Sequence, residues 1–443
     1  MNSEEFQPLA TWLNKSIVPH EPSHWRLPTA SRVSLSSFSR YWVNLWLLLV
    51  AVIFVVNTPG CASLPKRNPV PKVQSEIAQI PGIPKARFWG DALPSDIDKR
   101  LAELKAQRLA NNPEALGRPH NYLAISGGGA NGAFGAGLLV GWTEAGDRPI
   151  FDMVTGISTG ALIAPFAFLG PAYDEQLKDV YTTVSTVELI KVRGFLKIIT
   201  GDAAASTKPM QKLIARYYDQ KMLAAIGAEY EKGRRLYVGT TNLDAERPVF
   251  WNITAIAASG DPKALELIHK ILLASASIPA AFPPVYIKVE AEGQRYDEIH
   301  VDGGTTIQVF LFPADLDWRA VAEKLRVKGE SRVYVIRNSY VRPRWEAVDP
   351  PRLVPIALRS ISSLIRTQGV GDIFRIYVQA QNAGIDYNLA HIPRDFHERP
   401  KEEFDPEYMK KLFDLGYGMA KDGYPWGKKP PGIEKGGTVN GKR

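Results

Sequence analysis

Two glycine-containing motifs, close together in the chain, most constrain what this sequence can fold into. Residues 126–132 read SGGGANG, and residues 156–160 read GISTG. An apolar stretch precedes each motif and a stretch of helix-forming residues follows it. The predicted strands are 122–126 and 151–155, and the predicted helices are 132–145 and 159–169. This alternation predicts an α/β fold with a mainly parallel sheet, and it places both motifs at the carboxyl ends of strands.

Ser158 lies at the centre of the second motif, which has the G-x-S-x-G spacing of a nucleophile elbow. In such an elbow, a strand turns sharply into a helix and leaves a serine hydroxyl accessible. Gly156 and Gly160 fit this geometry, because a Cβ atom at either position would collide across the turn. The flanking FDMVT and ALIAPFAFL segments favour this interpretation over a structural serine or a helix cap.

The first motif has two possible uses. Its G-x-G-x-x-G spacing is typical of dinucleotide sites, which need an acidic residue at the end of the second strand. Here that strand ends in the serine motif, and Asp152 lies at its start, which argues against a dinucleotide. The other use is an oxyanion hole made of backbone N–H groups. The candidate donors are Gly127, Gly128, Gly129, Ala130 and Gly132, and of these we favour Gly128 and Gly129.

A serine nucleophile needs a base, and the sequence offers an acid more readily than a histidine. The histidines after Ser158 lie in no convincing motif; they are His269, His300, His391 and His397. Asp302 follows a predicted strand and precedes Gly303 and Gly304, which let the backbone bend toward another loop. Two catalytic arrangements therefore remain open: Asp302 acts alone as the base, or it acts in a triad with His391 or His397. The simplest alternative is that Asp302 is only a residue of an ordinary turn.

Together the motifs GGGANG, GISTG and DGG resemble the patatin-like phospholipase family in order and spacing. Two further stretches are similar to that family: residues 274–284, with ASASIP and FPP, and residues 240–252, with TTNLD and a Trp-Asn pair. The resemblance covers about residues 121–310 and extends to a strand near 333–337. It implies a three-layer fold in which helices flank a mainly parallel central sheet.

The resemblance implies that Ser158 is the nucleophile, that Asp302 is the proton acceptor, and that the 127–132 loop forms the oxyanion hole. It implies hydrolysis of phospholipids or other lipid esters without a metal or cofactor. Many relatives carry a basic residue where this chain has Ala130-Asn131, which weakens phosphate binding by this loop. A free aspartate, with a pKa near 3.9, is a weak base, so the site must raise that pKa. A lipid-binding protein without catalysis is the remaining alternative.

The amino-terminal region carries a membrane signal. Residues 41–56 read YWVNLWLLLVAVIFVV, a run shorter than a span of about 20 residues and closer to the core of a signal peptide. Arg32 and Arg40 precede this run, which orients the amino terminus toward the cytoplasm. Cys61, the one cysteine, follows in NTPGCAS, which resembles a lipoprotein lipidation site, although Thr58 and Pro59 match it poorly.

We therefore expect a lipoprotein modified at Cys61, with an uncleaved anchor helix or a buried core segment as alternatives. Both membrane interpretations place the catalytic domain outside the cytoplasm, in the cell envelope. A single cysteine excludes a disulfide framework and a cysteine-rich zinc site. The net charge of +8 fits contact with anionic lipid surfaces, and no basic run interleaved with aromatic residues indicates nucleic-acid binding.

The chain divides into four predicted parts. Residues 1–61 are the signal or anchor segment, and residues 62–118 are a linker, exposed over 62–85, and a leading helix over 94–110. Residues 119–340 are the catalytic domain, and residues 341–443 are a helical extension whose tail is disordered from 427. We expect the leading helix to bury one face, formed by Leu93, Ile97, Leu101, Leu104 and Leu109. Residues 185–206 and 339–353 are candidate parts of a substrate rim.

Overall fold

The computed structural model describes residues 67–184, 191–192, 205–345 and 347–433. The predicted membrane run at 41–56 and Cys61 lie outside these residues, as do most of residues 185–206. Within the described ranges, no helix is both long enough and apolar enough to cross a membrane.

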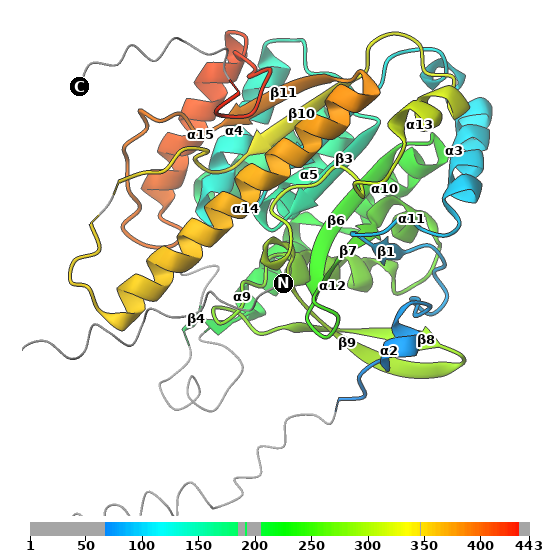
Figure 1. Cartoon of the computed structure of the whole chain (residues 1–443), viewed down its shortest axis with the longest axis horizontal. Helices are drawn as coiled ribbons and strands as arrows, with labels where there is room; N and C mark the ends of the chain where they lie inside the picture. Colours follow the sequence, from blue (N-terminus) through cyan, green and yellow to red (C-terminus); the bar gives the residue numbers. More distant parts are fainter. Residues whose placement is uncertain (1–66, 185–190, 193–204, 346, 434–443) are drawn as a thin grey trace, which may run out of the picture. The chain divides into compact units, whose positions relative to one another are not determined.

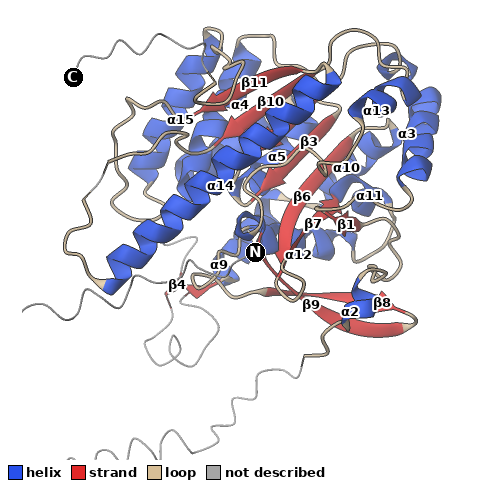
Figure 2. Ribbon diagram, viewed as in Figure 1, coloured by secondary structure: helices blue, strands red, loops and turns tan. Residues whose placement is uncertain are grey.

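A nine-stranded sheet forms the centre of the described domain (Figures 1 and 2). Its main path runs in the order β1-β7-β6-β3-β2-β10-β11, and β9 pairs with β6 and with β8. The five neighbours from β6 to β11 are parallel, and the other pairs are antiparallel. The strands are β1 (Arg87–Trp89), β2 (Asn121–Ile125), β3 (Met153–Ile157), β6 (Arg235–Asn242), β7 (Arg247–Asn252), β8 (Val285–Ala291), β9 (Gln294–Asp302), β10 (Arg332–Arg337) and β11 (Asp386–His391). A separate two-stranded ribbon pairs β4 (Lys191–Val192) with β5 (Ala205–Ser206).

Helices cover both faces of this sheet, as the three-layer prediction requires. One face packs against α4 (Gly132–Glu144), α5 (Thr159–Leu169), α6 (Asp174–Thr183), α9 (Lys208–Tyr217), α10 (Gln220–Glu231), α11 (Ile253–Ala258), α12 (Ala264–Ser275) and α15 (Pro406–Lys421). The other face packs against α13 (Trp318–Lys324) and α14 (Leu353–Ala383). Because both faces are covered, β3 and β6 are buried along their whole length.

Local sequence explains where several helices begin and end. Asp405 caps α15, because its carboxylate accepts the backbone N–H groups of Glu407 and Tyr408, and Pro406 occupies the first helical position. Gly384 adopts a left-handed conformation, with φ of 67°, directly after the last residue of α14.

Backbone atoms of α4 and α15 approach each other closely. A Cβ atom added to Gly137 or Gly141 of α4 would clash with the backbone of α15, and one added to Gly416 would clash with the backbone of α4. Glycines on both helices therefore permit this contact. Since α4 begins directly after the glycine-rich loop, α15 supports the helix that anchors the loop.

The amino-terminal boundary differs from the prediction. Residues 67–85 are no exposed linker: they contain the short helix α2 (Lys72–Ser75), and Ala78, Ile80 and Ile83 are buried against the domain. The leading helix α3 (Ile97–Asn111) exists, but Leu109 is 52% exposed and Arg108 is buried instead. Arg108 follows the 3.6-residue period from Leu101 and Leu104, and it is buried because its guanidinium bonds to the Gly233 carbonyl.

The carboxyl-terminal boundary is also different. The sequence predicts a helical extension over residues 341–443, yet β11 belongs to the central sheet and α14 and α15 cover its two faces. The expected disorder from residue 427 is wrong at its start, because Gly427 pairs with Leu389 and Lys428 binds Asp386. This part of the chain completes the domain, and residues 434–443 lie outside the described residues.

Candidate active site

Ser158 occupies a strained turn between β3 and α5. Its backbone has φ of 54° and ψ of −125°, a region that non-glycine residues rarely adopt at a cost of about 1–3 kcal/mol. A Cβ atom on Gly156 would clash with the backbone of Gly160, and one on Gly160 would clash with the Ile125 carbonyl. The two flanking glycines thus allow the sharp turn that their spacing predicts.

Ser275 fixes the backbone at Ser158. The Ser158 N–H donates to the Ser275 hydroxyl oxygen at 3.0 Å, and that hydroxyl donates to the Gly239 carbonyl at 2.7 Å. All three residues are buried. The N–H of Ser158 is therefore engaged in holding the turn, and Ser275 ties the end of α12 to the elbow.

The glycine-rich loop lies against Ser158. The Cβ position of Gly127 would lie 3.1 Å from the Cβ atom of Ser158. Three N–H groups of the loop have acceptors: Gly127 donates to the Gln308 carbonyl at 3.2 Å, Asn131 to the Gly128 carbonyl at 3.1 Å, and Gly132 to the Gly129 carbonyl. The prediction that Gly127 and Gly132 donate to an oxyanion conflicts with these bonds.

The N–H groups of Gly128 and Gly129 remain as candidate donors, with Ala130 next in line. Among the described residues the Gly128 N–H has no hydrogen-bond acceptor. Gly129 and Ala130 begin a 3₁₀ turn (Gly129–Asn131), where N–H groups have no partner inside the turn. Gly129 has φ of 56°, which favours glycine.

Asn338 holds the loop from the other side. It follows β10, and its side-chain amide donates to the Ser126 carbonyl at 3.0 Å while its side-chain oxygen accepts the Gly135 N–H at 3.0 Å. A Cβ atom on Gly128 would clash with the Asn338 carbonyl. The loop is therefore preorganised by hydrogen bonds on both of its flanks.

Asp302 ends β9 and is buried, with 6% of its surface exposed. Its Oδ1 atom accepts the Gly304 N–H at 2.7 Å, and its own N–H donates to the Ser277 carbonyl at 2.9 Å. Its Oδ2 atom has no hydrogen-bond partner among the described residues. Gly303 allows β9 to approach β6, because a Cβ atom there would clash with the Gly239 carbonyl.

Burial raises the pKa of the Asp302 carboxyl to about 7, from an ordinary value of 3.8. The Ser158 hydroxyl and the Gly304 N–H act in the opposite direction and lower this pKa. Ser158 and Asp302 are therefore close neighbours, although the carboxylate forms no well-aligned hydrogen bond with the hydroxyl. Burial therefore shifts the Asp302 pKa in the direction that a general base at this position needs.

The histidines that follow Ser158 have other partners. Burial lowers the pKa of His300, whose ring nitrogens contact the Thr240 hydroxyl and the Glu298 carboxylate at 3.0 Å each. His269 contacts the Tyr218 carbonyl at 2.6 Å, and His397 is exposed. His391 ends β11, three strands from β3 in the sheet, which is about 14 Å at the usual strand spacing.

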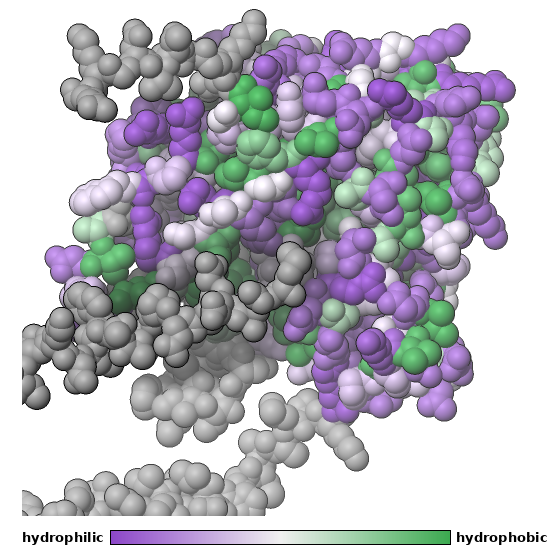
Figure 3. Space-filling model, in the orientation of Figure 1, coloured by the Kyte–Doolittle hydropathy of each residue, from purple (hydrophilic) through white to green (hydrophobic). Residues whose placement is uncertain are grey.

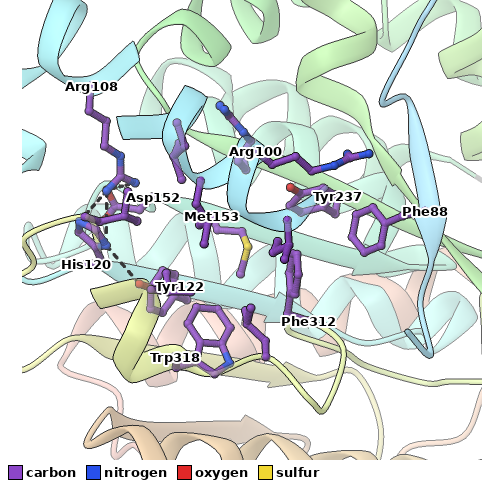
Figure 4. Close-up of a pocket in the computed structure, with 17 residues that line it drawn as sticks. Phe88, Arg100, Arg108, His120, Tyr122, Asp152, Met153, Tyr237, Phe312 and Trp318 are labelled. Carbon is purple, nitrogen blue, oxygen red and sulfur yellow. Dashed lines mark hydrogen bonds and ion pairs between the residues drawn. The ribbon is translucent and has the colours of Figure 1, made fainter. Parts of the chain in front are cut away.

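A buried apolar cavity lies at the opposite end of the same strands (Figure 4). It has a volume of about 90 Å³, and His120, Tyr122 and Asp152 line one end of it. Burial lowers the pKa of His120 to about 4, so this ring is neutral at pH 7. These residues lie at the amino ends of β2 and β3, whereas Ser158 follows the carboxyl end of β3. This cavity is therefore separate from the serine site.

Sequence reasoning missed three supporting residues: Ser275, Gln308 and Asn338. Ser275 lies in the ASASIP stretch that carried part of the resemblance, so that stretch was a usable signal. Gln308 accepts the Gly127 N–H through its carbonyl and donates from its side chain to the Gly304 carbonyl at 2.6 Å. No local pattern marks Gln308 or Asn338. In the described part of the chain, no group of three or more His, Cys, Asp or Glu residues is placed to hold a metal ion.

The chain is similar to a known protein family and to solved structures. A family model described as patatin-like phospholipase matches residues 123–315. No curated protein matches the chain at a significant level. Among solved structures, VipD from Legionella pneumophila is similar over 69% of this chain and 67% of its own, with 13% identity and a TM-score of 0.33. ExoU from Pseudomonas aeruginosa, solved with SpcU, is similar over 69% of this chain and 52% of its own, with 15% identity and a TM-score of 0.30.

The matched residues 123–315 contain the glycine-rich loop, Ser158 and Asp302. The central sheet is mainly parallel and flanked by helices, which is the architecture that the sequence resemblance implies. Residues 123–315 therefore match the patatin-like phospholipase family model, and this match supports lipid hydrolase activity.

Proposed function

We propose that this protein hydrolyses acyl esters of lipids with a Ser158–Asp302 dyad and a backbone oxyanion hole. The observation that carries the proposal is the buried Asp302 carboxylate, which has a pKa of about 7 and lies beside the serine of a strained elbow. A pKa near the working pH is what general base catalysis needs.

In the proposed reaction, Asp302 takes the hydroxyl proton as Ser158 Oγ attacks the ester carbonyl carbon. The N–H groups of Gly128 and Gly129 donate to the oxygen that becomes negative, and such donors lower a barrier by several kcal/mol. The C–O bond to the alcohol then breaks, and Asp302 gives the proton to the leaving oxygen. Water, deprotonated by Asp302, attacks the acyl-serine, and the fatty acid leaves as Ser158 regains its proton.

The first test is labelling by a fluorophosphonate probe, which reacts with activated serines. The folded wild-type protein is expected to incorporate the probe at Ser158, and the Ser158→Ala variant is expected to incorporate none there. A folded wild-type protein that takes up no label would favour the alternative of a lipid-binding protein without catalysis.

A second test separates the dyad from a triad that uses a histidine. We expect Asp302→Asn to lower the labelling rate at least 100-fold, because a general base typically contributes 10²–10⁴-fold. His391→Ala and His397→Ala are expected to keep the rate within about twofold, since one ring lies three strands away and the other is exposed. A loss of labelling in either folded histidine variant would support the triad.

The substrate itself is best identified with a panel of lipids. Mass spectrometry of the products from a mixed panel, comparing wild type with Ser158→Ala, reports which acyl esters are cleaved. We expect free fatty acids and the matching lysolipids or alcohols to form with the wild-type protein alone. Equal amounts with both proteins would argue against esterase activity.

We also propose that residues 1–61 tether the domain to the cell envelope, with Cys61 as the lipidated residue. The apolar run at 41–56 and the position of the one cysteine support this proposal. Metabolic labelling with an alkyne fatty acid is expected to mark the wild-type protein and not Cys61→Ser. A label that persists in Cys61→Ser would exclude this cysteine as the lipidation site.

A further inference from the structure

A cavity rich in arginine lies beside the glycine-rich loop, and its lining residues other than Asn131 follow the matched family region. It has a volume of about 600 Å³ and is formed by the segment after β10, the first half of α14 and the segment before α15. Among the described residues, its lining contains five arginines and one acidic residue: Arg342, Arg344, Arg359, Arg366, Arg399 and Glu398. Glu398 forms an ion pair at 3.1 Å with Lys411, which does not line the cavity. Basic side chains therefore outnumber acidic ones in the described lining of the cavity.

Hydrogen bonds hold this cavity together and join it to the loop. Arg359 donates to the Arg344 carbonyl at 2.6 Å, which links α14 to the preceding segment. The Arg344 guanidinium lies 4.4 Å from the centre of the Tyr340 ring. Asn131, which lines the cavity, accepts the Tyr408 hydroxyl at 2.6 Å and belongs to the turn that carries Gly129. The cavity is therefore adjacent to the proposed oxyanion hole.

The direction of α14 places its first half on the active-site side. β10 and β11 are parallel neighbours joined through α14, so the helix runs back and starts at the carboxyl edge of the sheet, where Ser158 lies. With 31 residues α14 is about 46 Å long, whereas the six residues of β10 span about 20 Å. The amino-terminal half therefore extends past the sheet, as Figure 1 shows at lower left.

This projecting half carries exposed apolar side chains next to the arginines. Trp345, just before the helix, is 90% exposed, and Leu364 is 70% exposed. Ile356, Ile361 and Ile365 are exposed as well. Figure 3 shows this face, on which both apolar and polar residues are exposed. Exposed aliphatic and tryptophan side chains beside arginines are typical of surfaces that enter the headgroup region of a membrane.

We infer that the first half of α14, Trp345 and the arginine cavity form a docking surface for a lipid membrane with phosphate-bearing, anionic headgroups. The apolar side chains enter the acyl boundary, and the arginines bind headgroup phosphate, for which their planar donors are suited. This inference rests on the proposed function and deepens it. The positive charge that the loop lacks at Ala130-Asn131 comes instead from the carboxyl-terminal part of the chain.

The test uses the full chain with Ser158→Ala, so that no lipid is hydrolysed, and it reads Trp345 locally. Fluorescence is measured on vesicles of phosphatidylcholine brominated in the acyl chains, with and without phosphatidic acid. The Trp345 signal is the difference from a protein that also carries Trp345→Phe. We expect quenching of Trp345 that increases with the phosphatidic acid content. Membrane binding through residues 1–61 alone does not bring Trp345 to the bromine atoms.

Charge variants test the cavity. Arg342→Gln with Arg366→Gln is expected to weaken Trp345 quenching by about fivefold for each charge removed. Lys99→Gln with Lys221→Gln, on α3 and α10, removes the same charge from exposed positions elsewhere and is expected to leave the quenching unchanged. Equal weakening by both pairs would mean a non-specific charge effect and would overturn the role of the cavity.

Two further outcomes distinguish the ligand sources. Inorganic phosphate that changes Trp345 emission, with no quenching by vesicles, would mean that the cavity binds free phosphate and would overturn docking on lipid. An absence of quenching on every vesicle would also overturn it, and would leave a protein as the partner of this surface. Fluorophosphonate labelling of Ser158 is independent of both results, so failure of the docking surface is distinguishable from failure of the hydrolase.

Discussion

At the scale of single residues, the environment of one carboxyl group decides the chemistry. Asp302 is buried beside Ser158; one of its oxygens is hydrogen-bonded, and the other has no partner in the described part of the chain. The sequence predicted which acid to consider, because two glycines follow it at the end of a strand. The proposed chemistry requires a raised pKa, but the burial that raises it was not predictable, since it depends on neighbours from α12 and β6 that are distant in the sequence.

The raised pKa predicts how Asp302→Asn changes stability. Between pH 4 and pH 7 the folded protein holds a proton that the unfolded chain releases, so this group's contribution to the free energy of unfolding decreases as the pH rises. Asparagine has no such charge to bury. We expect the variant to gain stability relative to wild type from pH 4 to pH 8, by up to about 4 kcal/mol. Chemical denaturation at both pH values measures this, and a difference that is constant with pH would contradict the raised pKa.

The backbone at Ser158 makes a second prediction at this scale. Glycine tolerates φ of 54° with ψ of −125° better than serine does, so Ser158→Gly is expected to stabilise the fold by about 1 kcal/mol relative to Ser158→Ala. Both variants remove the hydroxyl, so the comparison isolates the backbone strain. Thermal denaturation of the two variants is the measurement, and a more stable alanine variant would mean that the elbow is unstrained.

At the scale of elements, the contact between α4 and α15 supports the loop. Gly416→Val would place side-chain atoms against the backbone of α4. We expect it to lower the free energy of unfolding by at least 2 kcal/mol, in the range of overpacked cores, and to slow labelling of Ser158 because the loop shifts. Gly418→Ala, in the same helix with open space around it, is the matched control and is expected to stabilise by about 1 kcal/mol. Equal effects of the two would exclude close packing as the cause.

Elements next to a motif were the most predictable. The strands and helices flanking the loop and the elbow lie within about two residues of their predicted positions, because apolar runs, glycines and helix formers agree there. β11 was not predicted: Asp386, Asn388 and His391 give its segment a polar appearance. Its burial comes from Tyr387, Leu389 and Ala390, and its pairing with β10 is a tertiary contact.

At the scale of the whole molecule, the described domain continues past the family match on both sides. Residues 67–93 pack onto it before the first predicted strand, and β11, α14 and α15 close it after residue 315. The sequence predicted the fold class, since that follows from the alternating pattern near the motifs. The predicted boundaries of the domain were incorrect at both ends. The proline-rich segment before the domain and the polar segment after it bury only a few apolar residues each, so neither shows a clear apolar pattern.

Truncation tests this account of the domain. A chain that ends at residue 340 lacks α15, which covers α4, and α14, which covers the other face of the sheet. We expect it to be insoluble or to unfold without a cooperative transition, whereas a chain that ends at residue 433 is expected to unfold like the full chain. Calorimetry of both proteins decides this. A cooperative transition in the shorter protein would mean that residues 341–443 are an extension that the catalytic domain does not need in order to fold.

The pH dependence of serine labelling tests the central claim most directly. The rate at which a fluorophosphonate modifies Ser158 is measured from pH 4 to pH 9 in the wild type and in Asp302→Asn. The account predicts that the wild-type rate rises with pH through a midpoint near 7, as Asp302 loses its proton, and that the variant is slower by at least 100-fold across this range. A midpoint near 4, or an Asp302→Asn protein that labels like the wild type, would contradict it.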